Sequence, residues 1–315
     1  MTATPGSIGV VAGPGPGQWS FGRGVRAAFA RFWVDGALMF SLEHAPWLAH
    51  RTRPFFLWWT WHTSRYIRGN LMENAGQLLG PGSTATARRR LAKQVLNNHW
   101  LFMTDFGRMR NWSRQRLLEE IVEVEGEQRY RRARSLRRGL ILVTAHLGSF
   151  EVGLAGIAER ERRVHVVFTR DAMGTFDRLR SERRQKLGVV EAPLDDGLAM
   201  WLQLRDALGR DEVVLMQGDR VMPGQKGVTI DFLGRPMRFP TGPVRLALAT
   251  NAPIVPVFTL HTPDRRIRIV LEEPIIVDDG ELMPAVRRLA KVIERYVGAH
   301  PEQWLMIHRV WEPHT

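Results

Sequence analysis

The sequence predicts an α/β fold, in which a mostly parallel central sheet is flanked by helices and follows an N-terminal helical region. From about residue 126, short β-rich runs alternate with helical stretches, an order typical of parallel strands joined by helices. Before residue 121, apolar residues recur at spacings of three and four with little β-branching, which indicates helices. We therefore expect a flexible tail over residues 1–22, a helical region over 23–125 and an α/β core over 126–315.

The elements can be assigned in chain order. The first 22 residues carry no charged side chain and are rich in Gly and Pro, so they lack the basic start and apolar centre of a secretory signal. In the helical region the clearest runs are 87–101 and 112–125, and Ser83 or Thr84 is placed to cap the first of them. In the core, the expected strands are 139–145, 164–169, 212–217, 228–232, 254–260 and 267–271, and the expected helices are 149–162, 176–187, 194–208, 243–250 and 281–300.

Basic residues and tryptophans gather in the first third of the chain. The whole chain carries 45 Lys and Arg against 32 Asp and Glu, and residues 1–120 hold 15 basic and 6 acidic side chains. Eight of the 11 Trp also lie in this part. Guanidinium groups pair with lipid phosphates and indoles sit at headgroup level, so we expect the helical region to associate with an anionic membrane surface. There are two alternatives: the tryptophans form a core beneath a solvated basic face, or the region binds nucleic acid.

The apolar segments of this region are too short to cross a bilayer. No stretch holds 18 or more uncharged apolar residues, so no clean transmembrane helix is expected. The segments 36–42 and 54–61 are interrupted or flanked by charged residues, which fits helices lying in the membrane interface. A pair of core helices fits them nearly as well.

Several classes of protein are excluded by what the sequence lacks. It contains no Cys, so a disulfide scaffold, a thiolate metal site and a cysteine nucleophile are ruled out. The histidines show no metal-ligand spacing with carboxylates, and no glycine-rich phosphate loop of the Walker or Rossmann type occurs. A Ser–His–Asp hydrolase lacks support because there is no Gly-x-Ser-x-Gly elbow. We expect neither a metal nor a cofactor.

His146 is the strongest candidate for chemistry, because it directly follows the buried-strand run 139–145. Catalytic groups in open α/β sheets gather at the carboxyl ends of strands. Ser149 is a plausible N-cap and places Glu151 in the first helical turn. A turn between them can bring the two side chains together, so that Glu151 fixes the tautomer of His146 and the free ring nitrogen takes a proton from a hydroxyl. The spacing alone is weak, since a core histidine and a helix-start carboxylate would look the same.

Four ordered blocks give this motif a context. They are Leu142–Glu151, Val167–Arg170, the run from Val214 to Pro236, and the run from Pro240 to Val257; the closing segments are Pro301–Trp304 and His308-Arg309. The blocks resemble the bacterial lipid A late acyltransferase family, the lauroyl and myristoyl transferases of the glycerolipid acyltransferase superfamily, with its His-x4-Asp/Glu signature. The resemblance covers roughly residues 60–311. The chain departs from the family pattern at Gln217–Arg220 and at Ser149-Phe150, and it shows no evident N-terminal spanning helix, which leaves the acceptor open.

The resemblance implies roles for charged residues beyond the His-x4-Glu motif. Arg170 matches an important arginine of the family and would hold an acceptor phosphate or the phosphopantetheine of the donor. Asp219 matches the acidic position of the third block and would orient Arg170 or Arg220, or contact the acceptor. Arg220, Lys226 and Arg235 lie in a loop similar to the substrate-charge site of the family. A surface salt bridge, a turn aspartate and a solvated basic loop are the respective alternatives.

Thr241 and Gly242 are the last candidates for binding. Together with Pro243 they have the sequence of a helix cap and first turn. The free N–H groups of such a helix start could receive a phosphate or a tetrahedral oxyanion.

These features together predict a membrane-associated O-acyltransferase with a His-x4-Glu dyad as general base. It would move a fatty acyl chain from an acyl thioester, on acyl carrier protein or coenzyme A, to a hydroxyl of a lipid A-type or other glycolipid or phospholipid acceptor. We expect a peripheral protein on the cytoplasmic face of the inner membrane, with no nucleic-acid partner. The alternatives are a phosphatidylinositol mannoside-type acyltransferase and a non-catalytic lipid-binding or membrane-scaffold protein of the same fold.

Overall fold

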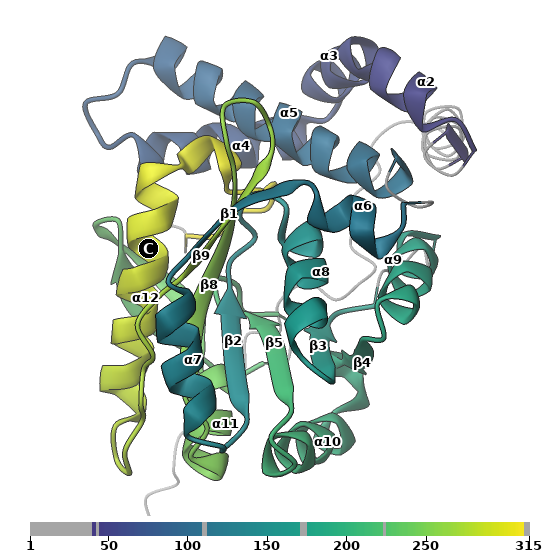
Figure 1. The fold of residues 1–315 in the computed structure, drawn as a ribbon. Helices are drawn as coiled ribbons and strands as arrows, with labels where there is room; N and C mark the ends of the chain where they lie inside the picture. The colour runs from purple at the N-terminus through teal and green to yellow at the C-terminus, as the bar shows by residue number, and fades with distance from the viewer. Residues whose placement is uncertain (1–39, 42–43, 109–111, 171–174, 223–224, 312–315) are drawn as a thin grey trace, which may run out of the picture.

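The computed structural model describes residues 40–41, 44–108, 112–170, 175–222 and 225–311. The predicted tail over 1–22 and most of the predicted interface segment 36–42 lie outside these residues. Over the described residues the chain forms a layer of N-terminal helices that lies across one end of an α/β core (Figure 1). The division of the chain into domains at residue 125 stays a prediction.

Among the residues that the structure describes, the N-terminal layer contains α2 (Pro46–Arg51), α3 (Arg53–Thr63), α4 (Arg65–Leu78) and α5 (Ala85–Arg108). The hydroxyl of Thr84 accepts a hydrogen bond from the amide of Ala87 at 3.1 Å, which confirms the predicted cap of α5. Trp61 of α3 and Leu71 of α4 are buried in a cluster with apolar residues of α5. In the part of the chain that the structure describes, no helix combines the length and the apolar character needed to cross a bilayer.

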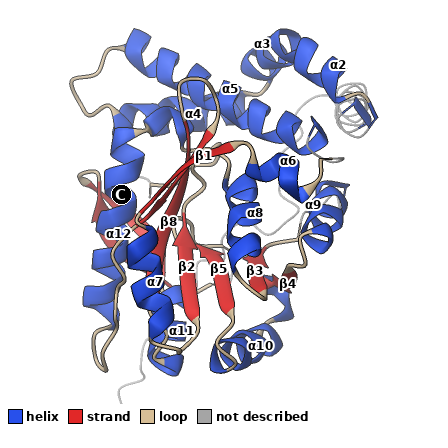
Figure 2. Ribbon diagram, in the orientation of Figure 1, coloured by secondary structure: helices blue, strands red, loops and turns tan. Residues whose placement is uncertain are grey.

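A seven-stranded sheet forms the core, with the strand order β1-β9-β8-β2-β5-β3-β4 (Figure 2). Every neighbouring pair is parallel except β8–β9, so the predicted mostly parallel sheet is confirmed. A separate antiparallel hairpin is formed by β6 and β7. The strands are β1 (Ile121–Glu125), β2 (Leu140–Thr144), β3 (Val164–Phe168), β4 (Val190–Pro193), β5 (Val213–Gln217), β6 (Gly227–Phe232), β7 (Arg235–Pro240), β8 (Ile254–His261) and β9 (Ile267–Leu271).

Helices cover both faces of the sheet, which is why all five residues of β2 are buried. Because side chains alternate along a strand, Leu140 and Leu142 pack towards α6, α7 and α8, whereas Ile141 and Val143 pack towards α10, α11 and α12. The helices of the core are α6 (Arg114–Leu118), α7 (Glu127–Ser135), α8 (Phe150–Arg160), α9 (Thr175–Lys186), α10 (Leu198–Gly209), α11 (Gly242–Thr250) and α12 (Leu282–Ala299).

One predicted element was wrong, one predicted strand lies outside the central sheet, and β4, β7 and α7 were not among the expected elements. The run 112–125 does not form one helix, because Ile121–Glu125 is the edge strand β1, paired with β9. The predicted strand 228–232 belongs to the separate hairpin and not to the central sheet. The short edge strand β4 was missed, since its four residues include the charged Glu191 and Pro193 and give little alternation.

The C-terminal segment, residues 301–311, connects the core to the N-terminal layer. Asn74 of α4 donates hydrogen bonds to the carbonyls of Met306 at 3.1 Å and His308 at 2.8 Å. Asn98 of α5 donates one to the carbonyl of Glu302 at 2.7 Å. These hydrogen bonds hold the C-terminal segment against α4 and α5.

Candidate active site

His146 lies two residues beyond the end of β2, in a short loop that leads into α8. Gly148 gives this loop its shape, with a φ of +59° that glycine adopts freely. A Cβ at this position would lie 2.0 Å from the carbonyl oxygen of Thr259 in β8. The loop is thus packed directly against the backbone of the sheet, and the position of His146 is fixed by the fold.

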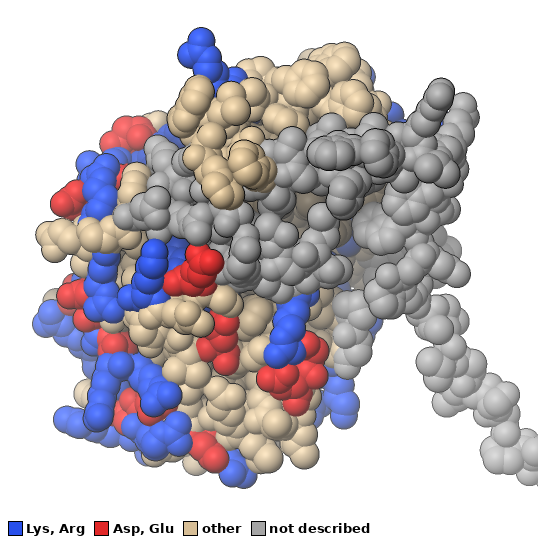
Figure 3. Space-filling model, turned by 90° about the vertical axis from the view of Figure 1, so that its right-hand side faces the viewer, with Lys and Arg blue, Asp and Glu red and all other residues tan. Residues whose placement is uncertain are grey.

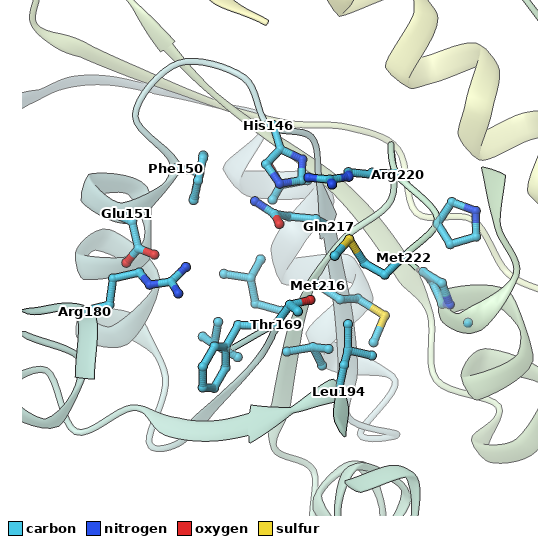
Figure 4. Close-up of a pocket in the computed structure, with 18 of the residues that line it drawn as sticks. His146, Phe150, Glu151, Thr169, Arg180, Leu194, Met216, Gln217, Arg220 and Met222 are labelled. Carbon is cyan, nitrogen blue, oxygen red and sulfur yellow. The ribbon is translucent and has the colours of Figure 1, made fainter. Parts of the chain in front are cut away.

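A cavity of about 440 Å³ lies beside His146 (Figure 4). Its walls come from α5, from the start of α8, from the ends of β3 and β5, and from the start of α11. About half of the lining side chains are apolar, among them Phe102, Phe150, Leu154, Val166, Val167, Phe168, Leu194, Trp201, Leu215 and Met216. The others include four arginines and three histidines. Apolar walls together with cationic groups suit a ligand that has an acyl chain and an anionic group.

The carboxylate that pairs with His146 is Asp219, just beyond the end of β5. Oδ1 of Asp219 lies 2.9 Å from Nδ1 of His146, and Oδ2 accepts a hydrogen bond from the backbone amide of the same His146 at 2.8 Å. The indole N–H of Trp304 donates to Oδ2 as well, at 2.9 Å. Burial would raise the pKa of Asp219, but the charge of His146 and these hydrogen bonds outweigh it and lower the pKa below its usual value. Asp219 is therefore a buried, fixed negative charge behind the imidazole.

The contacts of Asp219 differ from the expected ones. Its side chain is fully buried, and neither Arg170 nor Arg220 hydrogen-bonds to it among the described residues, although its charge acts on Arg220. A role of Asp219 towards either arginine or the acceptor stays a prediction. The sequence correctly placed Asp219 at the carboxyl edge of the sheet. It could not show that the partner of this carboxylate would be the histidine 73 positions earlier.

Glu151 pairs with an arginine instead of with His146. Its Oε1 accepts a hydrogen bond from Arg184 of α9 at 2.7 Å, and both side chains are buried. Within the described part of the chain, no hydrogen bond joins Glu151 to His146, so the expected contact of the two side chains was wrong. Figure 4 shows the reason, because Phe150 stands between the two residues and Glu151 points to the wall that carries Arg180. Whether Glu151 is needed for catalysis stays a prediction.

The remaining predicted residues divide into those that line the cavity and those that do not. Arg170 lines it, and its guanidinium pairs with Asp195 and with Asp196, the latter at 3.0 Å. Arg220 lines it close to His146 (Figure 4) and forms no hydrogen bond or ion pair with any described residue. Lys226 precedes β6 and Arg235 is the first residue of β7, and neither of them lines the cavity.

The start of α11 meets the cavity through Gly242, not through Thr241. Thr241 is the N-cap residue, as predicted. Its amide and its hydroxyl both donate hydrogen bonds to the carbonyl of Lys226, at 3.2 and 3.3 Å. The hydroxyl also accepts a hydrogen bond from Arg245 at 3.1 Å. Gly242 lines the cavity, and a Cβ there would lie 2.8 Å from the ring of Trp201. A binding role for either residue stays a prediction.

Two histidines to which the sequence gave no role also line the cavity. Burial, and next the charge of His146, lowers the pKa of His99 to about 4. Burial, and next the charges of Arg220, His99 and His146, lowers the pKa of His308 to about 4. Both rings are therefore uncharged at neutral pH. They lie 47 positions before and 162 positions after His146, so no local pattern could have indicated them.

These two histidines predict how stability depends on pH. The unfolded chain takes up their protons near the ordinary value of 6.5, and the folded chain only near 4, so the free energy of unfolding should fall as the pH drops through this window. Urea titrations at a series of pH values measure the slope. A His99→Gln/His308→Gln variant should have a flatter profile than the wild type between pH 6.5 and 4. Equal slopes for the two proteins would contradict the assignment of neutral rings.

No group of three or more His, Asp or Glu side chains among the described residues is arranged to hold a metal ion. The cations at the cavity are arginines, which offer several N–H donors to an anion.

Comparisons with known proteins agree with this geometry. Residues 54–312 match the family described as bacterial lipid A biosynthesis acyltransferase. The chain is 25% identical over 174 residues to a phosphatidylinositol mannoside acyltransferase of Mycobacterium tuberculosis, which covers 55% of this chain and 54% of that protein. It is also 25% identical over 175 residues to one of Mycolicibacterium smegmatis, covering 55% of this chain and 57% of that protein. The chain thus spans about half the length of the curated relatives that it matches.

Proposed function

Because the chain belongs to the bacterial lipid A biosynthesis acyltransferase family, we propose that it transfers a fatty acyl chain from a thioester to a hydroxyl of a glycolipid. The donor is acyl carrier protein or coenzyme A carrying the acyl group. The acceptor is a lipid A-type precursor or, as the names of the relatives suggest, a phosphatidylinositol mannoside. The pairing of His146 with a buried carboxylate beside a cavity with apolar walls carries this proposal.

His146 acts as the general base. Its Nδ1–H donates to Asp219, which leaves the Nε2 lone pair for the acceptor hydroxyl in the cavity. Nε2 takes the hydroxyl proton while the acceptor oxygen forms a bond to the thioester carbonyl carbon, and the charged Asp219 stabilises the imidazolium that results. The tetrahedral oxyanion then collapses, the carbon–sulfur bond breaks, and the leaving thiolate takes the proton back from Nε2. The products are an ester and a free thiol, and the base is regenerated.

Glu151 supports the site from the opposite wall. Its ion pair with Arg184 joins the first turn of α8, which follows the His146 loop, to α9. Arg184 also lies 5.0 Å from the ring centroid of Phe168 at the end of β3. This role is structural and does not require Glu151 to touch the imidazole.

Arg220 binds a negative charge of a substrate, a phosphate of the acceptor headgroup or of the phosphopantetheine of the donor. Burial lowers the pKa of this side chain, but arginine keeps its charge in proteins. The charge of Asp219 acts on this guanidinium, but no hydrogen bond or ion pair joins it to a described residue, so an anionic ligand would offset the cost of its partial burial. Its position beside His146 would hold the bound substrate close to the base.

Arg220→Gln is expected to raise the KM for the phosphate-bearing substrate about tenfold, because one charge-assisted hydrogen bond is lost. Separate titrations of acceptor and donor identify which substrate carries the phosphate. Lys226→Gln is the matched control, an exposed cation from the same sequence block that lies outside the cavity, and its KM values should stay near those of the wild type. Equal KM values for both variants and the wild type would contradict the role of Arg220.

The N-terminal helices hold the protein on an anionic membrane surface, at the cytoplasmic face of the inner membrane. Residues 44–72 contain four Arg and no Asp or Glu. Trp47, Phe55 and Trp58 are 69%, 54% and 56% exposed. At the top of the face in Figure 3, where the N-terminal helices lie, uncharged residues predominate, whereas acidic and basic residues are interspersed below. Exposed aromatic rings next to arginines fit a layer of lipid headgroups.

Replacing Trp47, Phe55 and Trp58 together by alanine should weaken binding to vesicles with equal parts of anionic and zwitterionic phospholipid at least tenfold, since three inserted rings are lost. Sedimentation with the vesicles measures this. Leu198→Ala removes an apolar side chain that is 74% exposed on α10 of the core, and it should leave binding unchanged. A similar loss in both proteins, or none in either, would contradict this membrane surface.

The proposed activity is tested by mixing the purified protein with a radiolabelled acyl thioester and an acceptor. Palmitoyl coenzyme A and palmitoyl-acyl carrier protein are compared as donors, and phosphatidylinositol mannosides and a lipid A precursor as acceptors. Label recovered in one of the lipids, with release of free thiol, supports the proposal. Lipid binding without transfer from either donor would favour the non-catalytic alternative.

A further inference from the structure

Asp219 accepts three hydrogen bonds, and two of them come from His146 itself. The ring Nδ1 lies at Oδ1, while the backbone amide of His146 and the indole N–H of Trp304 share Oδ2. The carboxylate is therefore held at both oxygens, and the imidazole is held by its ring and by its backbone. Among the described residues, Trp304 is the only side chain besides that of His146 that hydrogen-bonds to the carboxylate of Asp219.

The C-terminal segment reaches the His146 loop through backbone hydrogen bonds as well. The amide of Leu305 donates to the carbonyl of His146 at 2.7 Å, and the amide of Gly148 donates to the carbonyl of Gln303 at 3.0 Å. Leu147 and Trp304 form an isolated antiparallel bridge between these two bonds. The side chain of Gln303 bonds both the amide and the carbonyl of His261 in β8, at 2.8 and 3.1 Å. Trp304 thus enters the site from a segment that is itself anchored to the sheet.

The ring of Trp304 is packed among other aromatic rings. The ring is buried, with Phe232 at a centroid distance of 6.0 Å and Trp311 at 5.7 Å in an edge-to-face contact. A buried indole N–H needs a partner, and here the partner is an ionised carboxylate, which makes the bond stronger than one to a neutral group.

We infer that Trp304 is a positioning residue for the base. Its N–H holds Asp219 in the one orientation that presents Oδ1 to Nδ1 of His146, and so it fixes the tautomer whose Nε2 can accept a proton. This inference rests on the proposed function, because it assigns a role in that same proton transfer.

The chemistry gives the direction of the effect when this N–H is removed. Without the donor, the charge on Asp219 is less stabilised, so its pKa rises and it attracts the imidazolium proton more strongly. Oδ2 then keeps only the backbone amide of His146 as a donor, so the carboxylate holds the ring of His146 less firmly in the orientation that presents Nε2 to the acceptor. The other groups that face His146 are Arg220, His99 and His308, and their direct contacts do not include the indole N–H.

The test is Trp304→Phe, which keeps an aromatic ring and removes the N–H. We expect kcat to fall about tenfold, the usual size for a lost hydrogen bond to a charged group, with KM values near those of the wild type. A loss that appears in kcat and not in KM is what a misplaced base produces, because substrate binding does not use this N–H.

Trp311→Phe is the matched control. Trp311 is equally buried in the same aromatic cluster, but its N–H donates to the backbone carbonyl of Phe232 at 3.2 Å. The control should lower the thermal midpoint by a similar amount and leave kcat near that of the wild type. A kcat that falls equally in the two variants, or in neither, would overturn the inference and leave Trp304 as a packing residue.

A second measurement does not depend on acyl transfer. In ¹⁵N-labelled protein, Asp219→Asn should move the indole N–H resonance of Trp304, which donates to this carboxylate, more than that of Trp311, which donates to the carbonyl of Phe232. Equal changes at the two indoles, or none at Trp304, would overturn the inference. Absence of acyl transfer by the wild type would count against the proposed function, and these resonances would still decide the contact.

Discussion

His146→Ala is expected to lower kcat about 10³-fold, because the acceptor hydroxyl then has no positioned base. Asp219→Asn should come close to this loss. The amide carries no charge to stabilise the imidazolium, and its NH₂ group favours the wrong tautomer of the ring. Rates of label transfer at saturating donor and acceptor measure both effects, with far-UV circular dichroism to show that each variant is folded.

The comparison of Asp219 with Glu151 decides between two assignments of the carboxylate. In the structure Asp219 hydrogen-bonds to His146, and Glu151 does not. Asp219→Asn should therefore cost much more in kcat than Glu151→Gln, measured at a temperature where both variants stay folded. If Asp219→Asn were nearly as active as the wild type while Glu151→Gln lost all transfer, the direct His146–Glu151 pair drawn from the sequence would be right after all.

The second large effect concerns stability. Glu151→Gln is expected to lower the free energy of unfolding by about 3 kcal/mol, because it leaves the buried charge of Arg184 without its main partner. Urea unfolding followed by tryptophan fluorescence measures this change. Glu191→Gln is the matched control, since Glu191 contacts the same guanidinium at 3.3 Å from a more exposed position, and its loss should be smaller.

A double replacement, Glu151→Leu with Arg184→Met, checks the cause. It removes both charges and keeps apolar volume, so it should recover most of the stability that Glu151→Gln loses. If the double variant were less stable than Glu151→Gln, the ion pair itself, rather than the uncompensated charge, would account for the stabilisation.

The location of the site could be predicted from the sequence, but its pairings could not. The run before His146 reads as a buried strand, and general rules place function at the carboxyl end of such a strand, which is where the cavity lies. The partner of a side chain, however, depends on which strands are neighbours. β2 lies beside β5, and this brings Asp219 to His146. Nothing in the spacing of His146 and Glu151 carries that information.

The same limit explains the other errors. Glu151 was predicted to face His146 because the two are close in sequence, but Arg184, on a helix 33 positions later, captures the carboxylate. Asp219 was expected to orient Arg170 or Arg220 or to contact the acceptor, whereas its third hydrogen bond comes from Trp304, 85 positions away. Local periodicity also misassigned Ile121–Glu125, which becomes a strand only because β9 lies beside it.

The hydrogen bonds around Asp219 join three stretches of chain that are 73 and 85 positions apart. Contacts that close such long loops are slow to form and depend on the whole topology being in place. In a partly folded molecule β2 and His146 could be in place before Asp219 reaches the ring. Such a molecule would lack the pair that forms the base, so it would be inactive rather than weakly active. Hydrogen exchange of the Trp304 indole should accordingly occur only through global opening, at the rate of the slowest amides of the central strands.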